Sequence, residues 1–210
     1  MTHRNPTDNR FLIALLVSFL AALAWSGAFP YDRLTWVLEV APAVVAAILL
    51  VATRRRFPFT RLVYICIWLH AIILVIGGHY TYAREPLFSW IRDTFHLARN
   101  HYDRLGHLAQ GFFPAMVVRE LLLRTSPLRR GKWMFTLVTC ACLAVSAFYE
   151  MLEWWAAVIS DQAASAFVGS QGDVWDAQWD MFLALIGAMS AQILLGRLHD
   201  RQLERLSQTA

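Results

Sequence analysis

The sequence predicts an all-α membrane protein with six transmembrane helices, on three observations. Hydrophobic residues make up 58% of the 210 positions and charged residues only 16%, which is more apolar than an ordinary soluble domain. The apolar residues form runs of about 20, long enough to cross the roughly 30 Å of bilayer hydrocarbon as helices. Basic residues gather in alternate connections between these runs, which is typical of a multi-pass membrane protein.

Six apolar runs define the predicted helices. They are Phe11–Phe29, Trp36–Ala52, Leu62–Gly78, Leu105–Leu123, Trp133–Trp155 and Trp179–Gly196. The first run is too long, and too closely followed by the second, for a cleaved signal peptide. No repeat, low-complexity tract or linker divides the chain, so residues 1–210 are expected to form a single transmembrane helical-bundle domain.

The basic residues predict that both termini are cytoplasmic. Short cytoplasmic loops are enriched in Lys and Arg. Of the 19 basic residues, 13 fall in the N-terminal tail, in the connections after the second and fourth runs, and in the C-terminal tail. Only five fall in the three other connections. Six helices place all four basic segments on one side, whereas five or seven would move one of them outside.

The longest outer connection with an internal pattern is REPLFSWIRDTFHLARNH, residues 84–101. Leu87, Trp90, Ile91 and Phe95 recur at roughly helical spacing, and the arginines fall away from them. A short amphipathic helix lying in the outer membrane interface fits this pattern. A helix folded over the mouth of the bundle fits it as well.

The motifs of several function classes are absent from the sequence. The three cysteines lie inside apolar runs, without zinc-ligand spacing or a disulfide framework. The net charge of +4 comes from arginines placed near helix ends, and no nucleic-acid-binding module accompanies it. Nor does the sequence contain HExxH, a phosphate-binding loop, a nucleophile elbow or a CxxC pair.

Two glutamates stand out in the fifth run, in the stretch VSAFYEMLEWW at 145–155. Glu150 and Glu153 are three residues apart and therefore share a helix face. They lie in the last turns of their helix, where the dipole is negative, so capping does not account for them. Two close carboxylates in a poorly hydrated place hold a proton or attract a cation. An ion pair with an outer arginine, Arg104 or Arg84, is the structural alternative.

Other ionisable residues are predicted to lie at the same membrane level. Asp103 and His107 are four residues apart on the fourth run, and Asp176 and Asp180 repeat this spacing at the start of the sixth. The full predicted cluster comes from four separate segments and comprises His79, Asp103, His107, Glu150, Glu153, Asp173, Asp176 and Asp180. Helix capping by the aspartates is an alternative explanation for each one taken singly.

This set of side chains suits a divalent metal such as magnesium, manganese or zinc. Asp103, His107, Glu150 and Asp180 are the expected metal ligands. Glu153 and Asp176 are the candidate catalytic carboxylates, with Glu153 as a general base or proton carrier. His79 and Asp173 complete the polar cluster. The same residues could instead relay protons or bind a polar headgroup.

Three segments closely resemble the YjdF-type family of bacterial inner-membrane proteins. They are YDRLGH at 102–107, SAFYEMLEWW at 146–155 and GSQGDVWDAQWDMFLALIGA at 169–188. The resemblance extends over most of the chain. It implies a multi-pass protein of the bacterial cytoplasmic (inner) membrane, and it supplies no reaction.

The order of polar residues also resembles, more distantly, the VanZ-like membrane proteins. That pattern has Asp-x-x-x-His opening one helix, aromatic-Glu-x-x-Gln closing the next, and aspartates opening a third that continues into Gly. The matching residues here are Asp103, His107, Tyr149, Glu150, Asp176, Asp180 and Gly187. The chain departs from the pattern at Glu153, where Gln is usual, and it lacks a clear counterpart of the arginine before the aspartates. The resemblance implies a role in the cell envelope, linked in some members to glycopeptide-antibiotic resistance.

Three functions remain open on the sequence. The first is a divalent-cation-dependent enzyme or binding protein that handles the headgroup of an envelope lipid or a lipid-linked cell-wall precursor. The second is a small proton-coupled transporter that uses the same acids as a relay. The third is a structural or accessory protein whose polar cluster locks the helix ends together. The expected partners are membrane lipids and no nucleic acid, and the sequence does not specify an oligomeric state.

Overall fold

A computed structural model of the chain describes residues 6–160 and 170–208. Within these ranges the protein is all-helical, with seven α-helices, one 3₁₀ helix and no strand. The elements are α1 (Pro6–Ala28), α2 (Arg33–Thr53), α3 (Arg61–Tyr80), η1 (Tyr82–Arg84), α4 (Pro86–Thr94), α5 (Tyr102–Thr125), α6 (Lys132–Ser160) and α8 (Asp176–Gln208). The predicted all-α class is confirmed.

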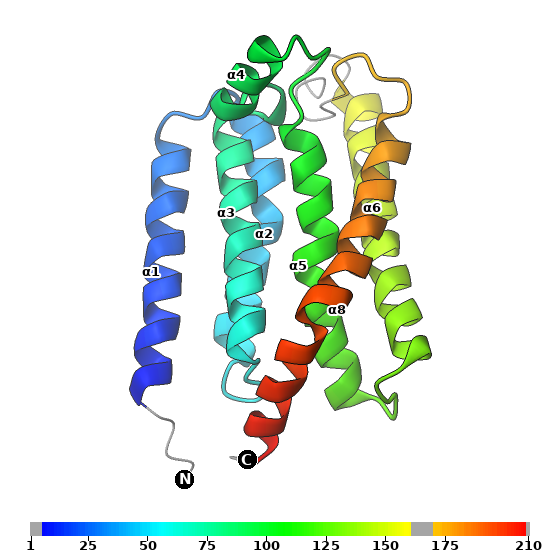
Figure 1. The fold of residues 1–210 in the computed structure, drawn as a ribbon. Helices are drawn as coiled ribbons and strands as arrows, with labels where there is room; N and C mark the ends of the chain where they lie inside the picture. The colour runs from blue at the N-terminus through cyan, green and yellow to red at the C-terminus, as the bar shows by residue number, and fades with distance from the viewer. Residues whose placement is uncertain (1–5, 161–169, 209–210) are drawn as a thin grey trace.

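The six long helices run up and down beside one another, and short α4 lies across one end of the bundle (Figure 1). The first turn of α1 and the last turn of α8 lie at the opposite end, which we call the termini end, and α4 marks the distal end. α5 is central: it packs against α3, α6 and α8, while α1 and α2 pack against α3. The start of α5, the end of α6 and the start of α8 therefore meet at the distal end.

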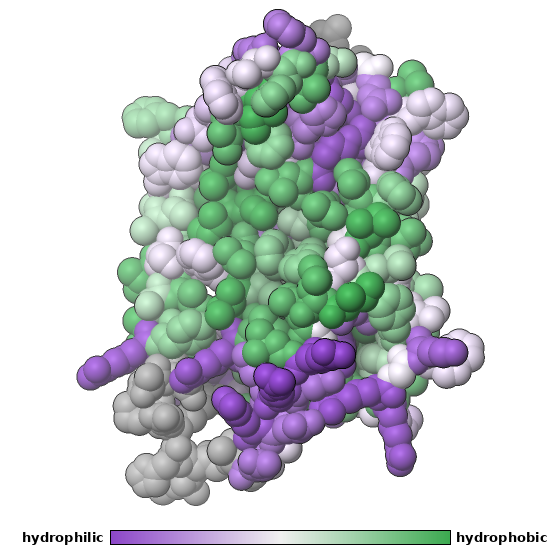
Figure 2. Space-filling view, in the orientation of Figure 1, coloured by the Kyte–Doolittle hydropathy of each residue, from purple (hydrophilic) through white to green (hydrophobic). Residues whose placement is uncertain are grey.

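Five of the described helices, α1, α2, α3, α6 and α8, are long and apolar enough to cross a membrane. On the face seen in Figure 2, a band of hydrophobic residues crosses the middle of the molecule, with hydrophilic residues at both ends. α5 falls short because polar residues interrupt it near both ends, including Asp103, His107, Arg119 and Glu120. Six spans therefore remains a prediction, and five spans are supported by length and composition.

Two helices continue beyond their predicted ends. α6 extends to Ser160 instead of ending near Trp155. α8 has 33 residues and continues to Gln208, 12 residues beyond the predicted end at Gly196. The apolar run ends near Gly196, but the helix does not, because good helix formers such as Leu, Arg and Gln follow it. Hydropathy marks the membrane-compatible part of a helix, not its last turn.

α5 and α8 cross at unusually close range. A Cβ atom added at Gly111 would lie 1.9 Å from the backbone oxygen of Ala184. A Cβ added at Gly187 would lie 2.2 Å from the backbone oxygen of Leu108. Only glycine permits backbones to approach this closely, as at other tight contacts between membrane helices.

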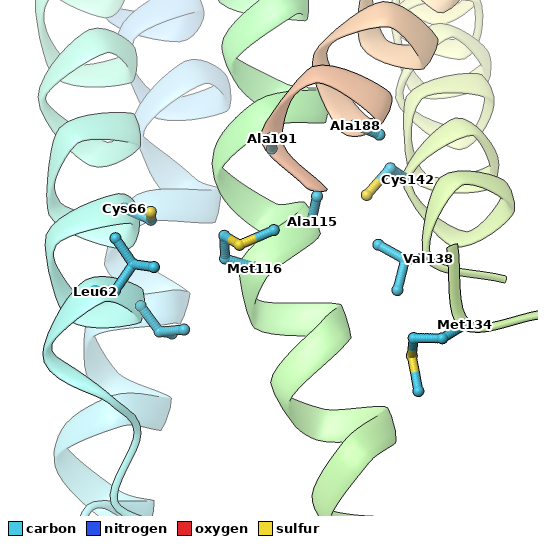
Figure 3. Close-up of a cluster of buried hydrophobic side chains, with 10 residues drawn as sticks. Leu62, Cys66, Ala115, Met116, Met134, Val138, Cys142, Ala188 and Ala191 are labelled. Carbon is cyan, nitrogen blue, oxygen red and sulfur yellow. The ribbon is translucent and has the colours of Figure 1, made fainter. Parts of the chain in front are cut away.

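The main apolar core lies between α3, α5, α6 and α8 (Figure 3). Cys66, Met116, Val138 and Ala188 are among its members, and each is at most 2% exposed. Cys66 and Cys142 are buried free thiols within this core, whereas Cys140 is a free thiol exposed on the outside of α6.

The predicted helix in residues 84–101 is shorter than its pattern. α4 ends at Thr94, and His96 has a φ of +52°, which breaks the helix. Beyond this break the chain folds back on α4. The Asn100 side chain donates hydrogen bonds to the Glu85 carbonyl and the Ser89 hydroxyl, at 2.9 and 3.0 Å. Leu87, Trp90 and Phe95 are exposed, so the amphipathic character is present, while placement in a membrane interface stays a prediction.

Candidate functional site

A cluster of buried ionisable side chains occupies the distal end of the bundle. α5 supplies Asp103 and His107, α6 supplies Glu150 and Glu153, and α8 supplies Asp176 and Asp180. Five of these six side chains belong to residues that are at most 8% exposed, and Glu150 is partly buried. The turn before α8 adds Asp173 at the edge. Seven of the eight residues predicted for the cluster are thus brought together.

His79 is the exception, and the prediction that it joins the acids is not reproduced by the structure. Its Nδ1 atom lies 3.0 Å from the backbone oxygen of Ser26 in α1, and its ring packs on Trp25 at a centroid distance of 4.3 Å. His79 follows α3 to the distal end as expected, but it faces α1 instead of α5. Membrane level was predictable for this residue, whereas its direction around the helix was not.

Two arginines hold the four aspartates. Arg104 on α5 pairs with Asp173 at 2.9 Å, Asp176 at 3.0 Å and Asp180 at 2.8 Å. Arg99, just before α5, pairs with Asp103 at 3.0 Å and with Asp176. Sequence reasoning placed Arg99 on the outer face of an amphipathic helix, but only 7% of it is exposed. The spacing of four residues between Arg99 and Asp103 was the feature of the sequence that could have predicted this ion pair.

The loops that carry these groups are tied to each other. The backbone amide of Asn100 donates to the Gln171 side-chain oxygen, and the Gln171 amide donates to the Asn100 carbonyl, both at 2.9 Å. Burial, with the guanidinium groups of Arg99 and Arg104 nearby, lowers the pKa of His101 between them. The imidazole of His101 is therefore neutral at neutral pH, and the two arginines supply the positive charge of this loop pair.

Glu150 and Glu153 have no such partner. Among the described residues, no Arg or Lys forms an ion pair with either carboxylate. The segment 161–169 lies outside the described residues, and its sequence, DQAASAFVG, has no basic side chain. The alternative ion pairs with Arg104 or Arg84 do not form, because Arg104 is engaged by aspartates and Arg84 lies over the Tyr31 ring.

His107 stands between the two groups of acids. Its Nε2 atom lies 3.5 Å from Asp103, and its Nδ1 atom lies 3.7 Å from Glu150. Neither Nδ1 of His107 nor Oε1 of Glu150 makes a hydrogen bond within the described part of the chain. Two buried polar atoms thus face one another across a gap slightly too long for a direct hydrogen bond.

Two sets of three residues could each hold a metal ion. Asp103, His107 and Asp180 form one set, and His107, Glu150 and Glu153 form the other. In each, the potential ligand atoms lie within 4.8 Å of one another. The first set already has Arg99 and Arg104 as counter-charges. Among the described residues, no Arg or Lys forms a direct ion pair with the carboxylates of the second set, so it is the one where a bound cation would supply a close positive charge.

A further acid joins the site from α2. Glu39 is only 2% exposed and accepts a hydrogen bond of 3.5 Å from the Tyr149 hydroxyl. Glu39 is not among the eight residues that the sequence predicted for the cluster. The apolar pattern of α2 hides which way Glu39 points, and a single carboxylate within a predicted span was the only signal.

A second buried polar network lies near the termini end. Glu120 accepts hydrogen bonds from the Thr60 hydroxyl at 2.7 Å and from Arg124 at 2.8 Å, and it lies 3.0 Å from His199. Arg119 contacts His199 at 2.9 Å and Asp200 at 2.8 Å. Each of these polar groups has a hydrogen-bond or ion-pair partner within the network. A structural role is therefore sufficient to explain why the network is buried.

Fold and site together define a multi-pass α-helical membrane protein with a buried cluster of acids at one end of its bundle. The chain belongs to the family described as "Predicted membrane protein (DUF2238)", whose model matches residues 11–201. It is 50% identical to the inner membrane protein YjdF of Escherichia coli (strain K12) over 183 residues, which are 87% of this chain and 88% of that protein. No solved structure matches it. The predicted YjdF-type family is confirmed, and the likeness to VanZ-like proteins stays a prediction.

Proposed function

We propose that this protein binds a divalent cation at the outer face of the bacterial inner membrane and uses it to hold the phosphate of an envelope lipid or lipid-linked precursor. The cation site consists of His107, Glu150 and Glu153. The observation that carries the proposal is the missing counter-charge: two neighbouring carboxylates on α6 and one imidazole face each other without a basic partner in the described chain.

Energetics support a bound cation or proton at this position. An unpaired charge is costly at membrane depth, so buried carboxylates pair, bind metal or hold a proton. Oxygen ligands with one imidazole suit magnesium, manganese or zinc. Asp103 and Asp180, also predicted as ligands, have guanidinium partners and are better suited to orienting His107 and α8. Asp176, predicted to be catalytic, is likewise held by both arginines.

The proposed orientation places the distal end outside the cytoplasm. The basic segments lie at the termini end, and α5 serves as a sixth span shielded by α3, α6 and α8. Trp154, Trp155, Trp175 and Trp179 are between 44% and 62% exposed near the site. Tryptophans gather at the membrane–water interface, so these four support a site at headgroup level, with α4 lying in the same interface.

A lipid phosphate fits this environment better than a free soluble ligand. A divalent cation held by two carboxylates keeps positions open for phosphate oxygens. In this proposal Glu153, which is 7% exposed, serves as the second carboxylate ligand of the cation and not as the general base expected from the sequence. The exposed tryptophans offer contacts to the glycerol and upper chain region of the same molecule.

Metal binding to the purified protein tests the proposal. After EDTA treatment and dialysis, we expect titration with Mn²⁺ or Zn²⁺ to show one site per chain. Glu150→Gln combined with Glu153→Gln should weaken binding at least tenfold. Glu204→Gln, an exposed carboxylate at the termini end, should bind as wild type. Absence of binding, or equal binding by the double variant, would disprove the cation site.

The transporter alternative has less support. The inner network contains two acids, Glu120 and Asp200, but it is separated from the distal site by the apolar core. The structural alternative is favoured for the arginine–aspartate part, where each aspartate has a guanidinium partner. It does not account for Glu150 and Glu153.

A further inference from the structure

A cavity of about 130 Å³ lies directly below the site, towards the middle of the membrane. α2, α3, η1, α5 and α6 enclose it, and His107 forms part of its wall. Half of the lining residues are apolar or glycine, and the other polar residues are His70, Tyr82, Gln110 and Tyr149. The volume is sufficient for several water molecules or for a polar group of similar size.

Two buried polar atoms of the lining, outside the proposed cation site, make no hydrogen bond within the described residues. They are Nε2 of His70 and Oε1 of Gln110. A buried polar atom without a partner is unfavourable by about 1–3 kcal/mol. Native proteins therefore supply partners for such atoms, and these two line one cavity. They indicate that the cavity is built for something that forms hydrogen bonds.

The cavity is closed on one side and opens on another. Towards the termini end it is followed by the apolar core, with Cys66 one turn from His70 and Met116 beyond Gln110 (Figure 3). On the flank between α2 and α6, the lining residues Pro42 and Val145 are exposed, Val145 by 53%. Since these are membrane-compatible helices, the opening faces lipid at acyl-chain depth.

The chemistry of the lining restricts the ligand. Oε1 of Gln110 only accepts hydrogen bonds, while each imidazole nitrogen donates or accepts according to its tautomer. An ester has acceptors alone and cannot serve Gln110, whereas a hydroxyl or an amide both donates and accepts. No charged side chain lines the cavity, so the ligand group is uncharged.

We propose that this cavity binds the uncharged hydroxyl or amide of an amphiphile that enters between α2 and α6 from the outer leaflet. The inference rests on the proposed function and deepens it, because His107 borders both sites. The phosphate of one lipid molecule binds the cation held by Glu150 and Glu153, while the hydroxyl or amide next to that phosphate binds in the cavity. The substrate class is thus a phosphate-bearing lipid with a free hydroxyl or amide next to the phosphate.

A matched pair of probes tests the cavity. 1-Palmitoyl lysophosphatidic acid and its 2-deoxy analogue share phosphate and chain, and they differ only in the hydroxyl. Native mass spectrometry of the detergent-solubilised full chain should show at least fivefold tighter binding of the hydroxyl probe. Gln110→Leu should abolish that preference. Equal binding of both probes by wild type, or a preference that survives Gln110→Leu, would overturn the inference.

The route of entry is tested separately. Val145→Trp should weaken binding of both probes severalfold by blocking the opening. Ile193→Trp, at a position 68% exposed on α8, is the matched control and should bind as wild type. Unchanged binding by Val145→Trp would contradict lateral entry. Both positions are exposed, so neither substitution disturbs the core.

Measurements with EDTA and with Mn²⁺ distinguish the two proposals. If the cation site is wrong and the cavity right, the hydroxyl preference persists and Mn²⁺ changes nothing. If the cavity is wrong and the cation site right, Mn²⁺ strengthens both probes equally and no hydroxyl preference appears. Ordered water alone in the cavity gives no preference between the probes and overturns the inference.

Discussion

Arg104→Gln should destabilise the protein strongly, because one guanidinium serves three carboxylates. Arg104 contacts Asp173, Asp176 and Asp180 at 2.8–3.0 Å, with its side chain only 12% exposed. The side chain of Asp180 is 2% exposed, so its charge would remain buried without its closest partner. Removing one member of a buried ion pair costs about 3–5 kcal/mol, and we expect a loss of stability in that range.

Equilibrium unfolding in mixed micelles of mild detergent and dodecyl sulfate measures this effect. Arg92→Gln is the control, because exposed Asp93 is the one ion-pair partner of Arg92 among the described residues, and surface pairs contribute about 0–1 kcal/mol. Adding Asp180→Asn to Arg104→Gln removes the orphaned charge and should recover part of the loss. A loss below about 1 kcal/mol for Arg104→Gln, no larger than for the control, would refute the reasoning about a desolvated charge network.

Three further predictions concern the scaffold. Gly187→Val should prevent α5 and α8 from closing, so that little folded protein is recovered after purification, while Gly196→Val, with nothing within 4 Å of its added Cβ, should fold normally. Asp32→Ala removes the N-cap of α2 and should cost about 1 kcal/mol in unfolding free energy at pH 7. Hydrogen bonds from Thr35 lower the pKa of Asp32 below 3.8, so this contribution is present above about pH 4 and lost in stronger acid, and unfolding measured at several pH values should show the gap narrowing. Glu120→Ala should lower stability by about 3–5 kcal/mol and leave Mn²⁺ affinity unchanged, and a change in that affinity would contradict our separation of the two networks.

The helices were predictable because membrane insertion selects long apolar runs, and five of the six predicted runs correspond to described helices that can span a membrane. α5 was predicted from the apolar run Leu105–Leu123 in the same way, although its composition is too polar for the criterion of length and hydropathy that the other five helices meet. The true ends of α6 and α8 were not predictable from hydropathy, because helix propensity continues into the charged residues that follow α8. Helix spacing likewise continued through residues 95–101, where a positive φ at His96 ends α4 early.

Much of the candidate site followed from topology. Successive helices run in opposite directions, and this alternation places the acids of α5, α6 and α8 at one end of the bundle. A spacing of three or four residues puts Glu150 on the same helix face as Glu153, and Asp103 on the same face as His107. The rotation of each helix about its axis was not accessible from one sequence. For that reason the sequence did not predict that His79 faces α1 or that Glu39 lies near the site. It also placed Arg99 on an exposed helix face, whereas its side chain is buried and pairs with Asp103.

The glycine contacts at Gly111 and Gly187 have a mechanical consequence. With backbone against backbone, α5 and α8 cannot slide or rotate past one another without a steric clash, so they form one rigid body that carries Asp103, Arg104 and Asp180. α6, which brings Glu150, has no glycine and therefore no contact of this kind with α5. The carboxylates of α6 are thus held against the α5–α8 pair by side-chain packing and not by touching backbones.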